Sequence, residues 1–233
     1  MLAMRYAITG ANRGLGLEFV RQLLNRGDSI DAGARSPAEA RQLQGLAQDS
    51  RGRLRIHTLD VSNPRSVAAF AAEVGQGQPV DVLINNAGVF GKNEPLGRLD
   101  FEDVEKTLTT NALGPLRLTS ALLPTLRRGQ SRRVVHITSI LGSIGDNAMG
   151  GYYGYRLSKA ALNMGMRNMH LELRAEGFVT IGINPGWVQT DMGGPQAPLR
   201  PEESVHAMLQ VIDGLSVEQS GRFFNYDGSE IPW

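Results

Sequence analysis

Short apolar runs and longer amphipathic segments alternate along the whole chain. The short runs are typical of buried strands, whereas the longer segments place apolar residues three or four positions apart, as in helices packed on a core. The predicted strands cover 6–8, 29–35, 54–59, 80–84, 134–137, 179–183 and 222–224, and the predicted helices cover 15–24, 67–74, 101–126, 153–173 and 201–215. This order predicts an α/β fold, doubly wound with right-handed crossovers around a mainly parallel sheet that has helices on both faces.

Length and composition favour one folding unit without a large net charge. The 233 residues are 41% hydrophobic, which suffices for one α/β core, so we expect a single domain over residues 1–233. Lysine and arginine number 24 and aspartate and glutamate 23, which leaves a net charge of +1. A chain so close to neutral has no general attraction for nucleic acid or for an anionic membrane, and we expect neither as a partner.

The types of residue in the chain limit the kinds of site it can form and its cellular location. Cysteine is absent, which excludes disulfides, thiolate catalysis and sulfur-ligated zinc. The histidines lack metal-ligand spacing, so we expect no metal site. No apolar run is long enough to span a membrane, and the first predicted strand begins too early for a signal peptide. We therefore expect a cytoplasmic protein.

A glycine-rich turn joins the first predicted strand to the first predicted helix. Its sequence is Thr9-Gly10-Ala11-Asn12-Arg13-Gly14-Leu15-Gly16. Glycine permits positive φ and close backbone approach, and the first amides of a helix favour an anion, so this turn suits the pyrophosphate of a dinucleotide. Considered alone, it also fits an ordinary strand–helix connection.

Three tyrosines cluster around the start of the predicted helix 153–173, and one of them has a lysine one turn ahead. Tyr155 and Lys159 are four residues apart, which places them on one face of a helix. A nearby ammonium group favours the phenolate, so the pair suits proton transfer near neutral pH. Considered alone, the spacing also fits an amphipathic helix with an exposed lysine.

Seven motifs resemble those of the short-chain dehydrogenase/reductase family, in the family's order and over nearly the whole chain. They are the glycine turn, Asp60-Val61, Asn85-Asn86-Ala87-Gly88, Asn111, Ser139, Tyr155 with Lys159, and Asn184-Pro185-Gly186 followed by Thr190. The resemblance is to the compact single-domain branch and implies a Rossmann-type fold. Within the family, the segment 223–233 and the stretch 13–18 resemble the C-factor and Sniffer-like carbonyl reductase subgroup.

The resemblance implies a set of catalytic roles. Tyr155 exchanges a proton with the substrate oxygen while hydride passes between the nicotinamide and the carbonyl carbon. Ser139 hydrogen-bonds that oxygen, Lys159 lowers the pKa of Tyr155 and holds the nicotinamide ribose, and Asn111 anchors a water. Thr138 is the competitor of Ser139, but neighbouring strand residues point to opposite faces, and the family's register favours Ser139.

Charge at the end of the second predicted strand favours NADP(H) over NAD(H). Arg35 stands where an NAD-selective site has a carboxylate, and Arg13 is a second cation for a 2'-phosphate. The alternative is that both arginines are merely exposed to solvent. Asp31 departs from the pattern, because it falls in a strand that should be buried and has no evident partner. The cofactor contacts that the resemblance implies are Gly10, Asn12, Arg13, Gly14, Leu15, Gly16, Arg35, Asp60, Val61, Asn86, Gly88, Tyr155, Lys159, Pro185, Gly186, Val188 and Thr190.

The function that these features favour is an NADP(H)-dependent carbonyl reductase or alcohol dehydrogenase acting on a small-molecule carbonyl or alcohol. The alternative is a cofactor-binding signalling or regulatory protein of the same fold, which the C-factor resemblance suggests. An epimerase or dehydratase of the longer family branch is disfavoured, because those enzymes need a further substrate domain.

Two further expectations concern assembly and the substrate side. The short segment between Ser139 and Tyr155 leaves the adjoining helices bare, which in the family implies a homodimer. Met164, Met166 and Met169 lie either on such a surface or in the core. The loop 189–200 is rich in glycine and proline and is interpreted as a flexible flap over the site.

Overall fold

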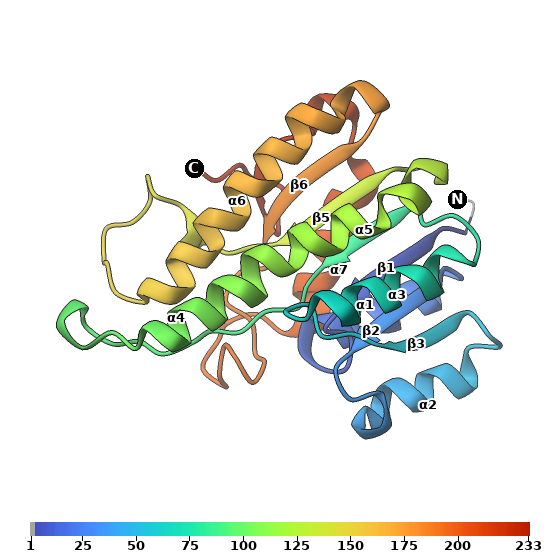
Figure 1. Ribbon diagram of the computed structural model, residues 1–233, viewed down its shortest axis with the longest axis horizontal. Coiled ribbons are helices and arrows are strands. Elements are labelled where there is room, and N and C mark those ends of the chain that lie inside the picture. Colours follow the sequence, from blue (N-terminus) through green and yellow to red (C-terminus); the bar gives the residue numbers. More distant parts are fainter. Residues whose placement is uncertain (1–2) are drawn as a thin grey trace.

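The computed structural model describes residues 3–233 and is built on one seven-stranded sheet (Figure 1). Its strands are β1 (Arg5–Thr9), β2 (Ser29–Ala34), β3 (Leu54–Thr58), β4 (Val82–Asn85), β5 (Arg133–Ile137), β6 (Val179–Asn184) and β7 (Phe223–Asn225). They lie in the order β3-β2-β1-β4-β5-β6-β7, and each adjacent pair is parallel. The predicted Rossmann-type, doubly wound fold is confirmed.

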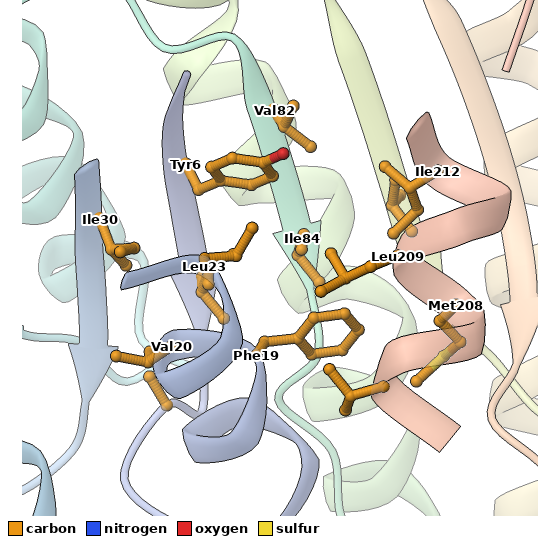
Figure 2. Close-up of a cluster of buried hydrophobic side chains, with 14 of the residues drawn as sticks. Tyr6, Phe19, Val20, Leu23, Ile30, Val82, Ile84, Met208, Leu209 and Ile212 are labelled. Atoms are coloured by element: carbon orange, nitrogen blue, oxygen red, sulfur yellow. The ribbon is translucent and has the colours of Figure 1, made fainter. Parts of the chain in front are cut away.

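Two groups of helices cover the two faces of this sheet (Figure 1). One group is α1 (Gly14–Asn25), α2 (Arg41–Asp49) and α7 (Pro201–Gly214), and the other includes α3 (Pro64–Gly75), α5 (Gly114–Arg128) and α6 (Tyr153–Leu173). Alternation along β1 separates the two cores, because Tyr6 and Ile8 pack in the first and Ala7 in the second. Figure 2 shows the first core, in which Phe19 of α1 and Leu209 of α7 cover the sheet.

Two segments differ from the sequence prediction. The helix α2 has no predicted counterpart, because the segment is polar overall and only Leu43 is fully buried, with Leu46 and Ala47 partly buried beside it. The segment predicted as one helix over 101–126 consists of α4 (Phe101–Leu108), a π-helical turn η3 (Thr109–Leu113) and α5. Pro115 has no amide hydrogen to donate to the carbonyl of Asn111, so α-helical hydrogen bonding is interrupted there.

The methionines of α6 divide between core and surface. Met166 and Met169 are buried, whereas Met164 is exposed. Of the three, only Met164 is therefore available to an intermolecular surface. Across residues 3–233, no helix has both the length and the hydrophobicity that crossing a membrane requires.

Asp31, which has no evident partner in the sequence, lies fully buried on β2 among cationic side chains. Its carboxylate is 2.7 Å from Arg5 Nε, 2.9 Å from His57 Nε2 and 3.1 Å from Arg55 Nε. Burial opposes ionisation of Asp31, but hydrogen bonds from His57 and Arg5 outweigh it and hold its pKa below the usual range. Asp31 therefore joins β1, β2 and β3 through charge and has a structural role.

His57 extends the same cluster to the surface. Its Nδ1 lies 2.7 Å from a carboxylate oxygen of Glu73 on α3, while its Nε2 faces Asp31. Burial disfavours the protonated ring, but the hydrogen bonds to Asp31 and Glu73 prevail and raise the pKa of His57. In this cluster, cationic side chains on β1 and β3 are thus matched by carboxylates on β2 and α3.

We expect Asp31→Asn to lower the free energy of unfolding by about 3 kcal/mol or more, because it leaves the buried Arg5 charge without a full counter-charge. Urea-induced unfolding at neutral pH measures the change. Glu73→Gln is the matched control: it also contacts His57, but its side chain is 59% exposed, so its loss should cost less than about 1 kcal/mol. Equal losses in the two variants would contradict a structural role for the buried carboxylate.

Candidate active site

The predicted site residues come from distant parts of the sequence and gather at the carboxyl edge of the sheet. The glycine turn follows β1, the segment 86–88 follows β4, Ser139 follows β5 and the segment 185–190 follows β6. These four strands are neighbours in the order β1-β4-β5-β6. The first turns of α6 bring Tyr155 and Lys159 to the same edge, which is where open α/β sheets bind ligands.

The backbone geometry of the glycine turn requires glycine at three positions. Gly10 and Gly14 have positive φ values of 64° and 52°, and a Cβ atom on Gly16 would lie 2.2 Å from the carbonyl oxygen of Gly10. The side chain of Asn86 fastens the turn to the end of β4, since its Nδ2 donates to the carbonyl of Thr9 at 2.8 Å. No residue larger than glycine fits at position 16 without moving the backbone.

The amino terminus of α1 is open toward a ligand. Its N-cap residue, Arg13, makes no side-chain capping bond, and its first turn contains no acidic residue. The first amides and the positive end of the helix dipole therefore remain suited to an anion. Together with the narrow glycine turn, this end of α1 fits the pyrophosphate of a dinucleotide.

A cleft of about 480 Å³ lies beside the turn, lined mainly by the segments 12–14, 39–42 and 189–191. Across it, Arg13 Nη1 is 2.5 Å from a carboxylate oxygen of Asp191 in the loop after β6. Arg35 is exposed just beyond β2 and does not line this cleft. Of the two arginines predicted to bind a phosphate, the structure thus places Arg13 at the cleft and pairs it with a carboxylate.

Other cofactor candidates hold the loops of this edge in place. The carboxylate of Asp60 accepts hydrogen bonds from the backbone N and the hydroxyl of Ser62, at 2.9 and 2.6 Å. Val61 packs against Gly114 at the start of α5, where a Cβ atom would lie 3.0 Å from the valine side chain. The methyl group of Thr190 faces Gly14 across the turn. The remaining candidates are Asn12 in the glycine turn, Leu15 in the first turn of α1, and Pro185, Gly186 and Val188 after β6.

Tyr155 is buried, with 7% of its surface exposed. Burial raises the pKa of its phenol to about 12, and a hydrogen bond with Ser139 partly offsets that effect. The ring of Phe90 lies 4.6 Å from the Tyr155 ring, between centroids. The phenol is therefore neutral near pH 7 and hydrogen-bonded with Ser139. The expectation that Lys159 holds the pKa of Tyr155 below its usual value is not met in this structure, because burial outweighs the favourable contacts.

Lys159 lies beside Tyr155 in a buried position. Its Nζ donates to the carbonyl oxygen of Ile137 at 2.8 Å and is 5.6 Å from the centroid of the Tyr155 ring. Burial lowers the pKa of Lys159 to about 8. The ammonium group is thus present near neutral pH and has no carboxylate partner among residues 3–233, which keeps its positive charge available to a ligand or to a phenolate.

Asn111 lies in the π-helical turn and reaches the segment after β4. Its Oδ1 accepts from the backbone N of Val89, and its Nδ2 donates to the carbonyl of Val89 and to the hydroxyl of Ser158, all within 2.9 Å. Gly88 separates it from Lys159: a Cβ atom there would lie 3.3 Å from Asn111 Oδ1 and 3.8 Å from Lys159 Nζ. Glycine at position 88 leaves room between the amide and the ammonium group.

Ser139 and Thr138 face different surroundings at the end of β5. The hydroxyl of Thr138 is buried and donates to Asn163 Oδ1 at 2.7 Å. Ser139 is partly exposed, and its hydroxyl accepts from the backbone N of Leu141 at 3.2 Å besides contacting Tyr155. Strand alternation separates the two hydroxyls as expected and leaves Ser139 at the site.

The motifs do not identify two aromatic residues near Tyr155: Phe90, which contacts the Tyr155 ring, and Tyr152, which contacts Phe90. The ring of Phe90 also lies 5.3 Å from the ring of Tyr152, between centroids. Tyr152 has a left-handed backbone, with φ 47°, immediately before α6, a conformation that is strained for a residue other than glycine. The only sequence feature that could have identified Phe90 is its place two residues after the Asn85–Gly88 motif. A single sequence does not distinguish it there from an ordinary loop residue.

Comparison with known proteins agrees with this arrangement. Residues 5–200 match the family described as short chain dehydrogenase. The C-signal of Myxococcus xanthus is 61% identical over 165 residues, which cover 71% of this chain and 99% of that protein.

Two solved structures share the fold over both chains. The carbonyl reductase Sniffer of D. melanogaster has a TM-score of 0.94 and 34% identity, covering 99% of this chain and 100% of that one. The NADPH-bound carbonyl reductase from chicken fatty liver has a TM-score of 0.94 and 36% identity, covering 100% of each chain. The chain therefore belongs to the short-chain dehydrogenase family and, within it, to the C-factor and Sniffer-like type.

Proposed function

We propose that this protein is an NADP(H)-dependent oxidoreductase that transfers hydride between nicotinamide and a carbonyl or secondary alcohol. The observation that carries the proposal is the grouping of Tyr155, Ser139 and Lys159 at the sheet edge that also holds the glycine turn. We further propose that the cofactor and catalytic sites share one domain, residues 1–233.

Tyr155 is the general acid and base of the proposed reaction. The nicotinamide, when bound, supplies or accepts the hydride. In reduction, the Tyr155 hydroxyl donates its proton to the substrate oxygen as negative charge develops there, and Ser139 donates a hydrogen bond to the same oxygen. In oxidation, the phenol oxygen takes the proton from the alcohol.

Lys159 supplies the positive charge that this proton transfer needs. Its ammonium group stabilises the phenolate that Tyr155 becomes, and it would also hold the hydroxyls of the nicotinamide ribose. Asn111 would hold a water through which protons reach solvent. Its place beside Gly88, close to Lys159 Nζ, supports that role.

The preference for NADP(H) rests on cations near the glycine turn. Arg13 and Arg35 would bind the 2'-phosphate of the cofactor. Arg35 also occupies the last position of the segment 29–35, where a carboxylate would favour NAD(H). The NADPH bound to the chicken carbonyl reductase, which has the same fold, supports this choice.

A second candidate function is a cofactor-binding signalling or regulatory protein. The observation that favours it is the 61% identity with a protein named C-signal. The two functions differ in turnover, because a regulatory protein needs only to bind the dinucleotide. NADPH binding without oxidation in the presence of any member of a mixed carbonyl panel would favour the regulatory function.

Assembly and location are further parts of the proposal. We propose a homodimer, for which the exposed Met164 of α6 is a candidate contact, and a cytoplasmic location. A monomeric mass by light scattering at micromolar concentration would overturn the dimer.

We expect Tyr155→Phe to lower kcat for carbonyl reduction by roughly 10² to 10⁴, the usual contribution of a general acid–base group, and to leave NADPH binding within about twofold. NADPH fluorescence titration and NADPH oxidation measure the two quantities. Tyr153→Phe is the control, because it removes a neighbouring hydroxyl on another face of α6 and should retain full activity. Unchanged turnover in Tyr155→Phe would refute the assigned role.

We expect kcat/KM for reduction to decline as pH rises through about 8. Burial lowers the pKa of Lys159 to about 8, so the ammonium form is present below that pH and is lost above it. Initial rates at limiting substrate over about pH 6 to 10 test this, since kcat/KM reports the groups of the free enzyme. In Lys159→Arg, whose guanidinium does not titrate in this range, the residual activity should show no such decline. The same decline in that variant would assign it to another group.

We expect Arg13→Ala and Arg35→Ala each to weaken NADPH binding by roughly tenfold or more, because charge-assisted hydrogen bonds contribute about 1.5 to 3 kcal/mol. NADH binding should change by less than about twofold, since NADH has no 2'-phosphate. Fluorescence titration with both cofactors measures the effect. Arg174→Ala, an exposed arginine after α6, is the control. Equal weakening for both cofactors would remove the arginines from the phosphate site.

A further inference from the structure

We infer that the segment Tyr226–Trp233, here called the tail, is a positioning element for the loop 143–151 and so helps determine which carbonyl substrates are accepted. This inference rests on the proposed function, because the loop joins Ser139 to Tyr155 and its importance follows from their roles. The tail bonds this loop at Ser143, Ile144 and Gly145.

The tail is a hairpin held on the last strand of the sheet. The backbone N of Asn225 donates to the carbonyl of Ser229 at 2.7 Å, and the backbone N of Ile231 donates to the carbonyl of Phe223 at 2.9 Å. The rings of Phe223 and Trp233 stack with centroids 5.7 Å apart and an interplanar angle of 29°. These contacts fix the direction in which the tail leaves β7.

The far end of the tail is bonded to the beginning of the loop. The backbone N atoms of Ile144 and Gly145 both donate to the main-chain oxygen of Trp233, at 3.0 and 2.7 Å. The buried hydroxyl of Ser143 donates to the carbonyl of Pro232 at 2.6 Å. In Figure 1 the end of the chain marked C lies on the same side of the molecule as this loop, beside α6.

Apart from the tail, the loop is held by its own turns and by α6: Gly150 N donates to Asn147 Oδ1 at 3.0 Å, and Arg156 Nε donates to the carbonyl of Gly150 at 3.2 Å. All residues from 144 to 151 are exposed, and the stretch contains Gly145, Gly150 and Gly151, which add backbone freedom. The other end of the loop is fixed, because the backbone N of Tyr152 donates to Asn93 Oδ1 at 2.9 Å. The tail therefore supplies the anchor at the end of the loop nearer to Ser139.

The consequence for the substrate follows from the position of the loop. The loop spans the two hydroxyls proposed to bind the substrate oxygen, so its conformation shapes the adjoining space. It also carries Ile144 and Met149, which are 78% and 81% exposed. Ordering these apolar side chains before the substrate binds would lower the entropic cost of binding, which predicts an effect on KM rather than on proton transfer.

Two variants test the inference by different routes. Trp233→Ala removes the ring that stacks on Phe223 and leaves every bond within the loop in place, whereas Ser143→Ala removes both the bond to Pro232 and a bond that the same hydroxyl accepts from the backbone N of Asp146. We expect amide hydrogen exchange over residues 144–151 to become about fivefold to tenfold faster, the scale of losing one hydrogen bond of ordinary net strength. KM for accepted carbonyls should rise by a similar factor, with kcat and the NADPH dissociation constant within about twofold.

Val217→Ala is the control, because it removes an exposed apolar side chain of the same terminal region that lies outside the tail. It should change neither exchange nor KM. Unchanged exchange in both test variants would overturn the inference, and faster exchange with unchanged KM would overturn the part concerning substrate. If none of the carbonyls supports NADPH oxidation by the unsubstituted protein, the proposed function fails, and the predicted effect on KM fails with it. Hydrogen exchange still decides separately whether the tail orders the loop.

Discussion

Parallel pairing of the strands is the constraint on which the rest of the structure depends. Because β1, β4, β5 and β6 are adjacent and parallel, the segments that follow them meet at one edge of the sheet. Asn86 then joins two of these ends, since its backbone N bonds the Thr9 hydroxyl at 2.9 Å and its side chain bonds the Thr9 carbonyl. A shift in register by one residue would turn Asn86 away from the glycine turn and remove the site.

Burial then sets the chemistry of the site. It disfavours the charged forms of both Tyr155 and Lys159, raising the pKa of the tyrosine to about 12 and lowering that of the lysine to about 8. The Lys159 ammonium has the carbonyl oxygen of Ile137 as its hydrogen-bond acceptor, and the part of the chain that the structure describes offers it no carboxylate partner. Negative charge that develops nearby restores the stabilisation that burial removes, so the site responds to an oxyanion or a phenolate.

Two arginine–aspartate pairs differ in burial. The buried pair has a structural role, whereas the exposed pair can exchange one partner for a ligand. Arg5 and Asp31 are almost fully buried, and neither can change partner without leaving an uncompensated charge. Arg13 and Asp191 have side chains 64% and 76% exposed, so their pair contributes little free energy and is readily exchanged for another anion. Exposure is therefore what makes Arg13 suitable for a cofactor phosphate.

The sequence by itself determined the order of the strands, the parallel sheet and the motifs after each strand, because hydrophobic periodicity and glycine geometry are local properties. Tyr155 and Lys159 share a helix face through spacing alone, and strand alternation separates Ser139 from Thr138. The partners of Asp31, the contact of Phe90 with Tyr155 and the bonding of Trp233 to the loop were decided only by the tertiary structure. Each of these joins residues far apart in sequence or depends on the geometry of packing, and such contacts leave no periodic signal in one sequence.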